Sequence, residues 1–158
     1  MKIVMTLLSH DEADIVDAHL AFHLNAGVDF VIATDHRSSD GTTEILESYA
    51  RDGHVHLIRE EQEEFHEAAF ITRMARLAAK QYGADWVINS ASDEFWWPRG
   101  RDLHDVLSAV PMRYGLVQGV VRHFVPRPEN GRHFAERMTV RLTLQAPMND
   151  PASPWRSY

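Results

Sequence analysis

The sequence predicts an α/β fold in which a mostly parallel sheet is flanked by helices, in the order β-α-β-α-β-α-β followed by a less regular α/β tail. Two observations support this prediction. Short aliphatic and β-branched runs alternate with stretches of ten or more residues at helical spacing, and such connections join parallel strands through right-handed crossovers. A length of 158 residues, 44% hydrophobic and 25% charged, is typical of one globular domain, so we expect 1–158 to form a single domain.

The first strand is expected at 2–8, which is a short aliphatic run. Asp11 and Glu12 follow it, and the apolar residues after them recur at helical spacing up to a stop signal at Asn25-Ala26-Gly27. We therefore expect a helix between the acidic pair and residue 25. By the same criteria we expect further strands at 29–34, 55–59 and 86–89, and further helices at 42–51, 63–82 and 102–110.

The last third of the chain is less regular. The stretches 114–125 and 137–144 are expected to be strands. Five prolines interrupt the chain from about residue 126 onward, namely Pro126, Pro128, Pro147, Pro151 and Pro154. We therefore expect an irregular, loop-rich tail.

Composition excludes several classes of function. The chain has no cysteine, which rules out disulfide scaffolds, thiolate zinc sites and cysteine nucleophiles. Its net charge of −7 repels phosphate backbones, so we expect no nucleic-acid partner. No apolar run approaches the roughly 18 residues of a membrane span, and no signal-peptide cleavage site follows the first residues. We expect no transmembrane segment and a cytoplasmic location.

Polar residues follow three of the predicted strands, at 9–12, 35–42 and 90–94. Ligands of open parallel sheets bind outside the carboxyl ends of the strands, so these loops are the expected site. Asp11, Asp40 and Asp93 have an alternative explanation, because acids also cap helices and turns. Asp35 is harder to explain in that way, since an acid at the end of a buried strand is costly unless it binds something.

Asp93 and Glu94 lie in the loop after the fourth predicted strand, following Ser90-Ala91-Ser92. Paired carboxylates are hard oxygen ligands of the kind that Mg²⁺ or Mn²⁺ accepts. The adjacent Trp96 and Trp97 could cover a sugar or a nucleobase, although packing in the core explains them equally well. We therefore expect Asp93 and Glu94 to bind a divalent cation.

Three segments together resemble a known family: AHLAFHLNAGVD, DHRSSDGT and WVINSASDEF. In this order the chain resembles the amino-terminal nucleotide-binding portion of a family-2-like glycosyltransferase with the GT-A fold. The resemblance implies a Rossmann-like fold that binds a nucleoside diphosphate sugar. It also implies a divalent cation, Mn²⁺ or Mg²⁺, at the diphosphate, and inverting transfer of the sugar to an acceptor hydroxyl.

The resemblance also assigns roles to single residues. The residues expected at the nucleotide are Leu8, Ser9, Asp35, Asp40 and Arg73. Among them, Asp35 corresponds to the acid that contacts the base or ribose, and Asp40 to the acid that shapes the S-x-D-G-T turn. Asp93 corresponds to the second acid of the D-x-D motif, which contacts the metal, and Glu94 is a possible substitute.

The sequence departs from the family pattern in three places. Ala91 replaces the first acid of the D-x-D motif, and His10 stands where relatives have a permanent cation. The chain is also shorter than such domains, so we expect either an amino-terminal portion of a longer enzyme or a shortened relative. No catalytic base can be named, because the tail acids Glu129, Glu136 and Asp150 are equivalent candidates.

Two other functions remain as alternatives. Because of Ala91, the chain could be a catalytically impaired domain that binds a sugar nucleotide or a partner. Acidic strand ends also serve metal-dependent phosphoesterases, although these need several converging ligands. Zinc peptidase chemistry is not supported, because His19 and His23 lack the accompanying carboxylate signature, and we expect His23 to pack against the sheet.

Overall fold

The structure is a computed structural model that describes residues 1–100, 102–125, 127 and 133–142. The chain divides into two compact units, Met1–Tyr114 and Gly115–Tyr158. No helix in the described ranges has the length and apolar character needed to cross a membrane.

The first unit contains a four-stranded parallel sheet with the strand order β3-β2-β1-β4. The strands are β1 (Ile3–Ser9), β2 (Phe30–His36), β3 (Val55–Glu60) and β4 (Trp86–Ala91). The helices are α1 (Val16–Asn25), α2 (Thr42–Arg51), α3 (Glu67–Lys80) and α4 (Leu103–Ser108). The predicted α/β class, with a parallel sheet flanked by helices, is therefore confirmed.

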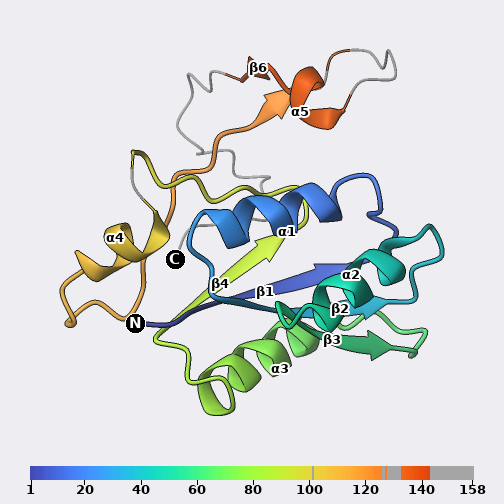
Figure 1. The fold of residues 1–158 in the computed structure, drawn as a ribbon, viewed down its shortest axis with the longest axis horizontal. Helices are drawn as coiled ribbons and strands as arrows, with labels where there is room; N and C mark the ends of the chain where they lie inside the picture. The colour runs from blue at the N-terminus through green and yellow to red at the C-terminus, as the bar shows by residue number, and fades with distance from the viewer. Residues whose placement is uncertain (101, 126, 128–132, 143–158) are drawn as a thin grey trace, which may run out of the picture. The chain divides into compact units, whose positions relative to one another are not determined.

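The central strands β1 and β2 are buried on both faces of the sheet, as alternation along β1 shows. Ile3 and Met5 point into the larger core cluster, which also contains buried residues of α1, α2 and α4. Val4, which lies between them, packs against Met74 and Ala78 of α3 on the opposite face. Figure 1 shows α3 and α1 on opposite sides of the sheet. Two buried faces explain why the strands read as continuous apolar runs.

The boundaries of α2 agree with the prediction, whereas α1 and α3 begin later than expected. The backbone carbonyl of Glu12 accepts hydrogen bonds from the N–H groups of Ile15 and Val16, so a turn precedes α1. Residues 61–66 are all exposed and have no apolar face to bury, and α3 starts only after them. The acidic pair Asp11-Glu12 therefore lies in a loop and not in the first helical turn.

The strand predicted at 114–125 is largely wrong. Only Phe124–Val125 form a strand, β5, which pairs in antiparallel fashion with β6 (Val140–Arg141). The helix α5 (Phe134–Arg137) lies between them in the chain. Leu116 and Val120 are 84% and 89% exposed, so these apolar residues have no neighbouring strand or layer to cover them in the described part. The strand predicted at 137–144 is reduced to Val140–Arg141 within the described residues, and 143–144 lie outside them.

Candidate functional site

The carboxyl ends of β1 and β4 form the topological switch point of the sheet. The chain leaves β1 toward α1 on one face, whereas it reaches β4 from α3 on the other face. The buried hydroxyls of Ser9 and Ser92 face each other across this point, with an Oγ–Oγ distance of 3.4 Å. Ser9 therefore lies at the expected site, while the side chain of Leu8 packs with the α3 cluster.

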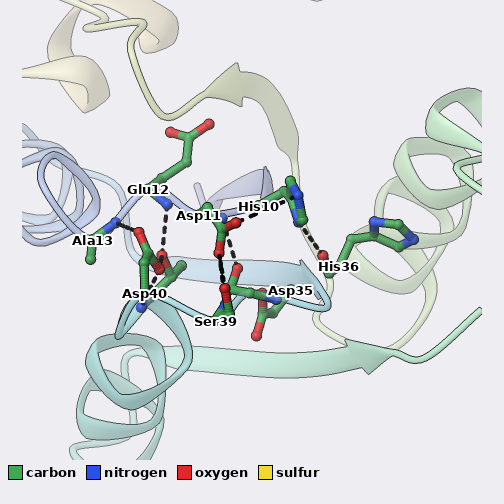
Figure 2. Close-up of polar contacts among 10 residues, drawn as sticks. His10, Asp11, Glu12, Ala13, Asp35, His36, Ser39 and Asp40 are labelled. Carbon is green, nitrogen blue, oxygen red and sulfur yellow. Dashed lines mark hydrogen bonds and ion pairs between the residues drawn. The ribbon is translucent and has the colours of Figure 1, made fainter. Parts of the chain in front are cut away.

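The loop after β1 is joined to the loop after β2 through Asp11 (Figure 2). One carboxylate oxygen of Asp11 accepts hydrogen bonds from the backbone N–H of Ser39 at 2.7 Å and from its hydroxyl at 3.3 Å. The backbone N–H of Asp11 donates to the hydroxyl of Ser38. Asp11 does not cap α1, because Ile15 is the N-cap residue and makes no side-chain capping bond.

Asp40 links the same two loops from the other direction. Its Oδ2 accepts from the backbone N–H of Ala13 at 2.9 Å, and its Oδ1 accepts from the N–H and hydroxyl of Thr42. The hydrogen bond from Thr42 lowers the pKa of the Asp40 carboxyl. Both oxygens of Asp40 therefore hold the loops in place, and a nucleotide contact by Asp40 stays a prediction.

Asp35 lies at the end of β2 and is only 4% exposed. Its carboxylate accepts hydrogen bonds from the N–H of Ser38 at 3.3 Å and from the hydroxyl of Thr43. The remaining side of Asp35 borders a pocket of about 310 Å³. The other lining residues are Arg37, Ser38, Thr43, Arg59 and Glu61.

The arginines of this pocket were not identified from the sequence. Arg37 forms an ion pair with Glu63, with a nitrogen–oxygen distance of 3.9 Å, and Arg59 forms one with Glu47. Arg59 is the penultimate residue of β3 and pairs with Asp35 in the sheet register. The pairing of β2 with β3, which the sequence does not state, brings Arg59 beside Asp35.

Arg73 lies on α3 and is not brought to the β1–β4 switch point. Its guanidinium pairs with the buried carboxylate of Glu60, at 3.2 Å, and lies over the ring of Phe70. These contacts hold α3 against the end of β3. A phosphate contact by Arg73 stays a prediction.

Asp93 and Glu94 form a tight turn directly after β4. The backbone N–H of Glu94 donates to the carbonyl of Ala91, and Oε2 of Glu94 accepts from the N–H of Ala91 at 3.2 Å. Asp93 is exposed, and its carboxylate has no hydrogen-bond or ion-pair partner among the described residues. Asp93 is therefore the carboxylate of the pair that is open to a ligand, whereas Glu94 closes the turn.

Glu12 is a site residue that sequence reasoning missed. Its side chain points away from Asp40 (Figure 2) and accepts a hydrogen bond from Ser92 at the switch point. Burial raises the pKa of the Glu12 carboxyl, the negative charge of Asp93 raises it further, and the hydrogen bond from Ser92 opposes both effects. In the sequence, the pair Asp11-Glu12 is typical of the start of a helix. The residues around Glu12 therefore gave no sign that it interacts electrostatically with Asp93.

Two histidines of α1 are buried beneath the turn that carries Asp93. Nε2 of His19 lies 3.2 Å from the hydroxyl of Ser90, and Nε2 of His23 accepts from the backbone N–H of Trp96 at 3.0 Å. Burial lowers the pKa of His19 to about 3, helped by the neighbouring His23, and lowers the pKa of His23 to about 4. His23 is buried, as expected, but its hydrogen bonds and ring contacts are with α1 and with the residues after β4, including Phe95 and Trp96.

The two tryptophans after this turn differ in their surroundings. Trp96 is half-buried and packs against the larger core cluster, as the packing alternative proposed. Trp97 is 78% exposed and borders a second pocket of about 510 Å³ together with Phe22 and Pro98. Of the three tail acids, Glu136 lies in α5, while Glu129 and Asp150 lie outside the described residues.

Two crystal structures from S. aureus are similar to this chain. TarS 1–349 has 17% sequence identity and a TM-score of 0.45, with 69% of this chain and 31% of that chain covered. TarS has 19% identity and a TM-score of 0.40, with 59% of this chain and 17% of that chain covered. The chain therefore spans about a third of the length of the first of these structures. No curated protein matches the chain.

A sequence family does match, over residues 6–114, and that span contains every predicted nucleotide and metal residue. The family is described as glycosyltransferase family 92. The predicted glycosyltransferase resemblance is thus confirmed, although the matching family is 92 and not 2. Two of the segments that carried the resemblance, DHRSSDGT and WVINSASDEF, include the carboxyl ends of strands, where they indicate a type of site more than a single family. Because the match spans more than half of its length, the chain belongs to glycosyltransferase family 92.

Proposed function

We propose that this chain binds a nucleoside diphosphate sugar with a divalent cation, Mn²⁺ or Mg²⁺, and transfers the sugar to an acceptor hydroxyl with inversion. Family membership supports sugar transfer as the reaction. Binding of the cation and of the donor is proposed from the surroundings of Asp93. Its carboxylate is exposed, has no protein partner in the described part of the chain, and lies beside the switch point of the sheet.

The residues around Asp93 fit a cation that is shared with a phosphate ligand. No group of three or more His, Asp or Glu side chains in the described ranges could hold a metal ion alone. Mg²⁺ commonly binds through one or two carboxylates and completes its coordination with water and substrate phosphates. Asp93 would supply the protein ligand, with Glu12 near enough to interact with it electrostatically. A cation bound there would neutralise the negative charge that develops on the departing diphosphate.

The nucleoside has a candidate position next to this site. The 310 Å³ pocket is polar, and Asp35 offers a carboxylate that can accept hydrogen bonds from ribose hydroxyls or from a base. Arg37 and Arg59 place positive charge at the same pocket in a chain whose net charge is −7. We propose that Asp35 binds the nucleoside and that Ser9 and Ser92 lie along the path from the nucleoside to the diphosphate.

A second function is favoured by one observation. Ala91 ends β4 at the position where the family-2-like pattern has an acid, and its exposed methyl group cannot bind a ribose hydroxyl or a metal-bound water. The chain would then be a catalytically impaired domain that binds a sugar nucleotide, or an interaction domain.

One experiment separates these functions. The purified protein is incubated with Mn²⁺ and a panel of sugar nucleotides, and both released nucleoside diphosphate and thermal stability are measured. Release of diphosphate that depends on Mn²⁺, by transfer or slow hydrolysis, supports the transferase. A rise in Tm without turnover supports the impaired binding domain. No shift and no release with any donor would refute donor binding.

A further inference from the structure

We propose that His23 is a positioning residue that fixes the turn carrying Asp93, by accepting a hydrogen bond from the backbone N–H of Trp96. The first step, holding the turn, concerns this structure alone. The second step, that the turn must be held for a cation and a diphosphate to bind, rests on the proposed function.

The hydrogen bonds of His23 set its tautomer. Nδ1 lies 2.8 Å from the backbone carbonyl of His19, which can only accept, so Nδ1 carries the proton. Nε2 therefore has a lone pair, and the N–H of Trp96 donates to it at 3.0 Å. The ring of His23 is fully buried, and both of its nitrogens are used. It thus joins the last turn of α1 to a loop 73 residues further along the chain.

His19 holds the other end of the same turn. The Ser90 hydroxyl lies 3.2 Å from Nε2 of His19 and donates to backbone carbonyls of the turn, including that of Glu94 at 3.1 Å. A hydroxyl has one proton, so Nε2 of His19 is the donor to Ser90, and its buried Nδ1 is left without a partner. Both histidines therefore contact the segment from Ser90 to Trp96.

Packing alone does not explain two imidazoles in this place. Val16 and Leu20 fill neighbouring core positions of the same helix with aliphatic side chains. Burying an imidazole costs desolvation free energy that a leucine or phenylalanine would not incur. What the imidazole adds is an acceptor at a defined distance from the Trp96 N–H, and a satisfied buried polar network fixes one geometry of its partners.

The consequence concerns Asp93, which lies at the tip of this turn. Its own carboxylate has no partner among the described residues, so its position depends on how the backbone on either side is held. Ser90 precedes it and Trp96 follows it, and these residues form hydrogen bonds with the histidines, while the rings of both histidines also contact Phe95. Ser92, 3.4 Å from Ser9, adds a weaker contact to β1.

The test compares three variants with the parent chain. His23→Phe keeps a buried ring but removes both hydrogen bonds. His23→Gln keeps a donor and an acceptor and is the conservative rescue. Leu107→Ala is the matched control, because it removes buried apolar volume on α4 and leaves the hydrogen bonds of the turn in place. If circular dichroism shows that His23→Phe is unfolded, His23→Asn replaces it, since its side chain is too short to reach Trp96.

Two readouts are measured. Hydrogen exchange of the peptide covering 92–96 reports whether the turn is held, and calorimetry with Mn²⁺ plus UDP, GDP or ADP reports the binding site. We expect His23→Phe to speed exchange and to weaken Mn²⁺-dependent binding by about tenfold each, the ratio expected for one lost buried hydrogen bond. His23→Gln should stay close to the parent chain, and Leu107→Ala should change neither quantity at the turn.

Unchanged exchange at 92–96 in His23→Phe would overturn the positioning role. Faster exchange with parental Mn²⁺-dependent affinity would overturn the link to Asp93, because the turn would then be loosened without effect on the cation. A parent chain that binds none of the three diphosphates refutes the proposed function and the second step with it. In that case the hydrogen exchange of 92–96 still decides whether His23 holds the turn.

Discussion

The carboxylate of Asp40 accepts a hydrogen bond of 2.9 Å from the backbone N–H of Ala13, and this bond joins the loop after β2 to the residues before α1 (Figure 2). Asp40 also accepts from the N–H and hydroxyl of Thr42 at the start of α2. One side chain thereby sets the distance between two loops of the candidate site.

Asp40→Ala should lower the free energy of unfolding by about 1 to 2 kcal/mol, the cost of losing a capping side chain. Asp40→Asn keeps one acceptor oxygen and should give an intermediate value. Urea denaturation at pH 7 measures both. An alanine variant as stable as the parent chain would show that Asp40 does not brace the loops.

Stability should fall as the pH falls from about 6.5 to about 4. Burial lowers the pKa of His19 to about 3 and of His23 to about 4, so the unfolded chain binds more protons than the folded one in this window. The free energy of unfolding is greatest above pH 6.5, where both histidines are neutral in the folded and the unfolded chain. Between pH 7 and pH 4.5, each histidine should lower it by about 2 kcal/mol or more. Urea denaturation at several pH values gives the slope.

The control for this pH dependence is the double variant His19→Gln/His23→Gln. Its stability should vary less between pH 7 and pH 4.5, because glutamine does not titrate. A slope equal to that of the parent chain would mean that other groups cause the loss.

Asp93→Ala should abolish Mn²⁺-dependent binding of a nucleoside diphosphate and leave the fold intact, because Asp93 is exposed and makes no contact that the described fold needs. Asp105→Ala removes the same charge from the exposed face of α4 and serves as the control. Calorimetry with and without Mn²⁺ measures the effect. Equal Mn²⁺-dependent affinity in Asp93→Ala and the parent chain would remove Asp93 from the site.

Asp35→Ala should weaken binding of a nucleoside monophosphate about ten- to hundredfold, with little change in the dependence on Mn²⁺. Asp35 also accepts a hydrogen bond from Thr43, so Thr43→Val tests whether loop geometry alone accounts for the loss. We expect a smaller effect from Thr43→Val in the same titration. Similar losses in the two variants would indicate that Asp35 acts on the loop and not on the nucleoside.

Ala91→Asp tests whether the donor site lacks only one acid. The new carboxylate should lower the Tm without metal, because it repels Asp93 and Glu94 nearby. With Mn²⁺ it should tighten binding of a sugar nucleotide by supplying an acceptor for ribose or metal-bound water. Thermal shift and calorimetry, each with and without Mn²⁺, separate the two effects. Loss of stability in both conditions with no gain in affinity would mean that the turn does not serve a nucleotide.

The strands and helices of the first unit could be predicted from the sequence because the signals for them are local. The run 30–33 is apolar throughout, and 42–51 combines helical spacing with a glycine on either side, at Gly41 and Gly53. The predicted strand at 114–125 shows the limit of such signals. Its apolar and β-branched residues are of the kind that strands favour, but a strand forms only where a partner covers it, and the local sequence does not contain the partner.

The composition of the site followed from the sequence only in part. Asp35 directly follows a predicted strand and Asp93 lies in the loop after another, and the rule that ligands bind at the carboxyl ends of parallel strands was enough to select them. The strand order β3-β2-β1-β4 decided which of these ends are neighbours. It placed Arg59 beside Asp35, and it brought Ser92 to Ser9 across 83 residues of chain.

Glu12, His19 and His23 depended on tertiary structure entirely. Each is ordinary in its local sequence, one as an acid before a helix and two as polar residues on an apolar helix face. Their raised or lowered pKa values and their hydrogen bonds arise from burial against the turn after β4, about 70 to 80 residues away in the chain. Local patterns specify secondary structure because backbone preferences act over a few residues, whereas burial and charge proximity exist only once distant segments pack together.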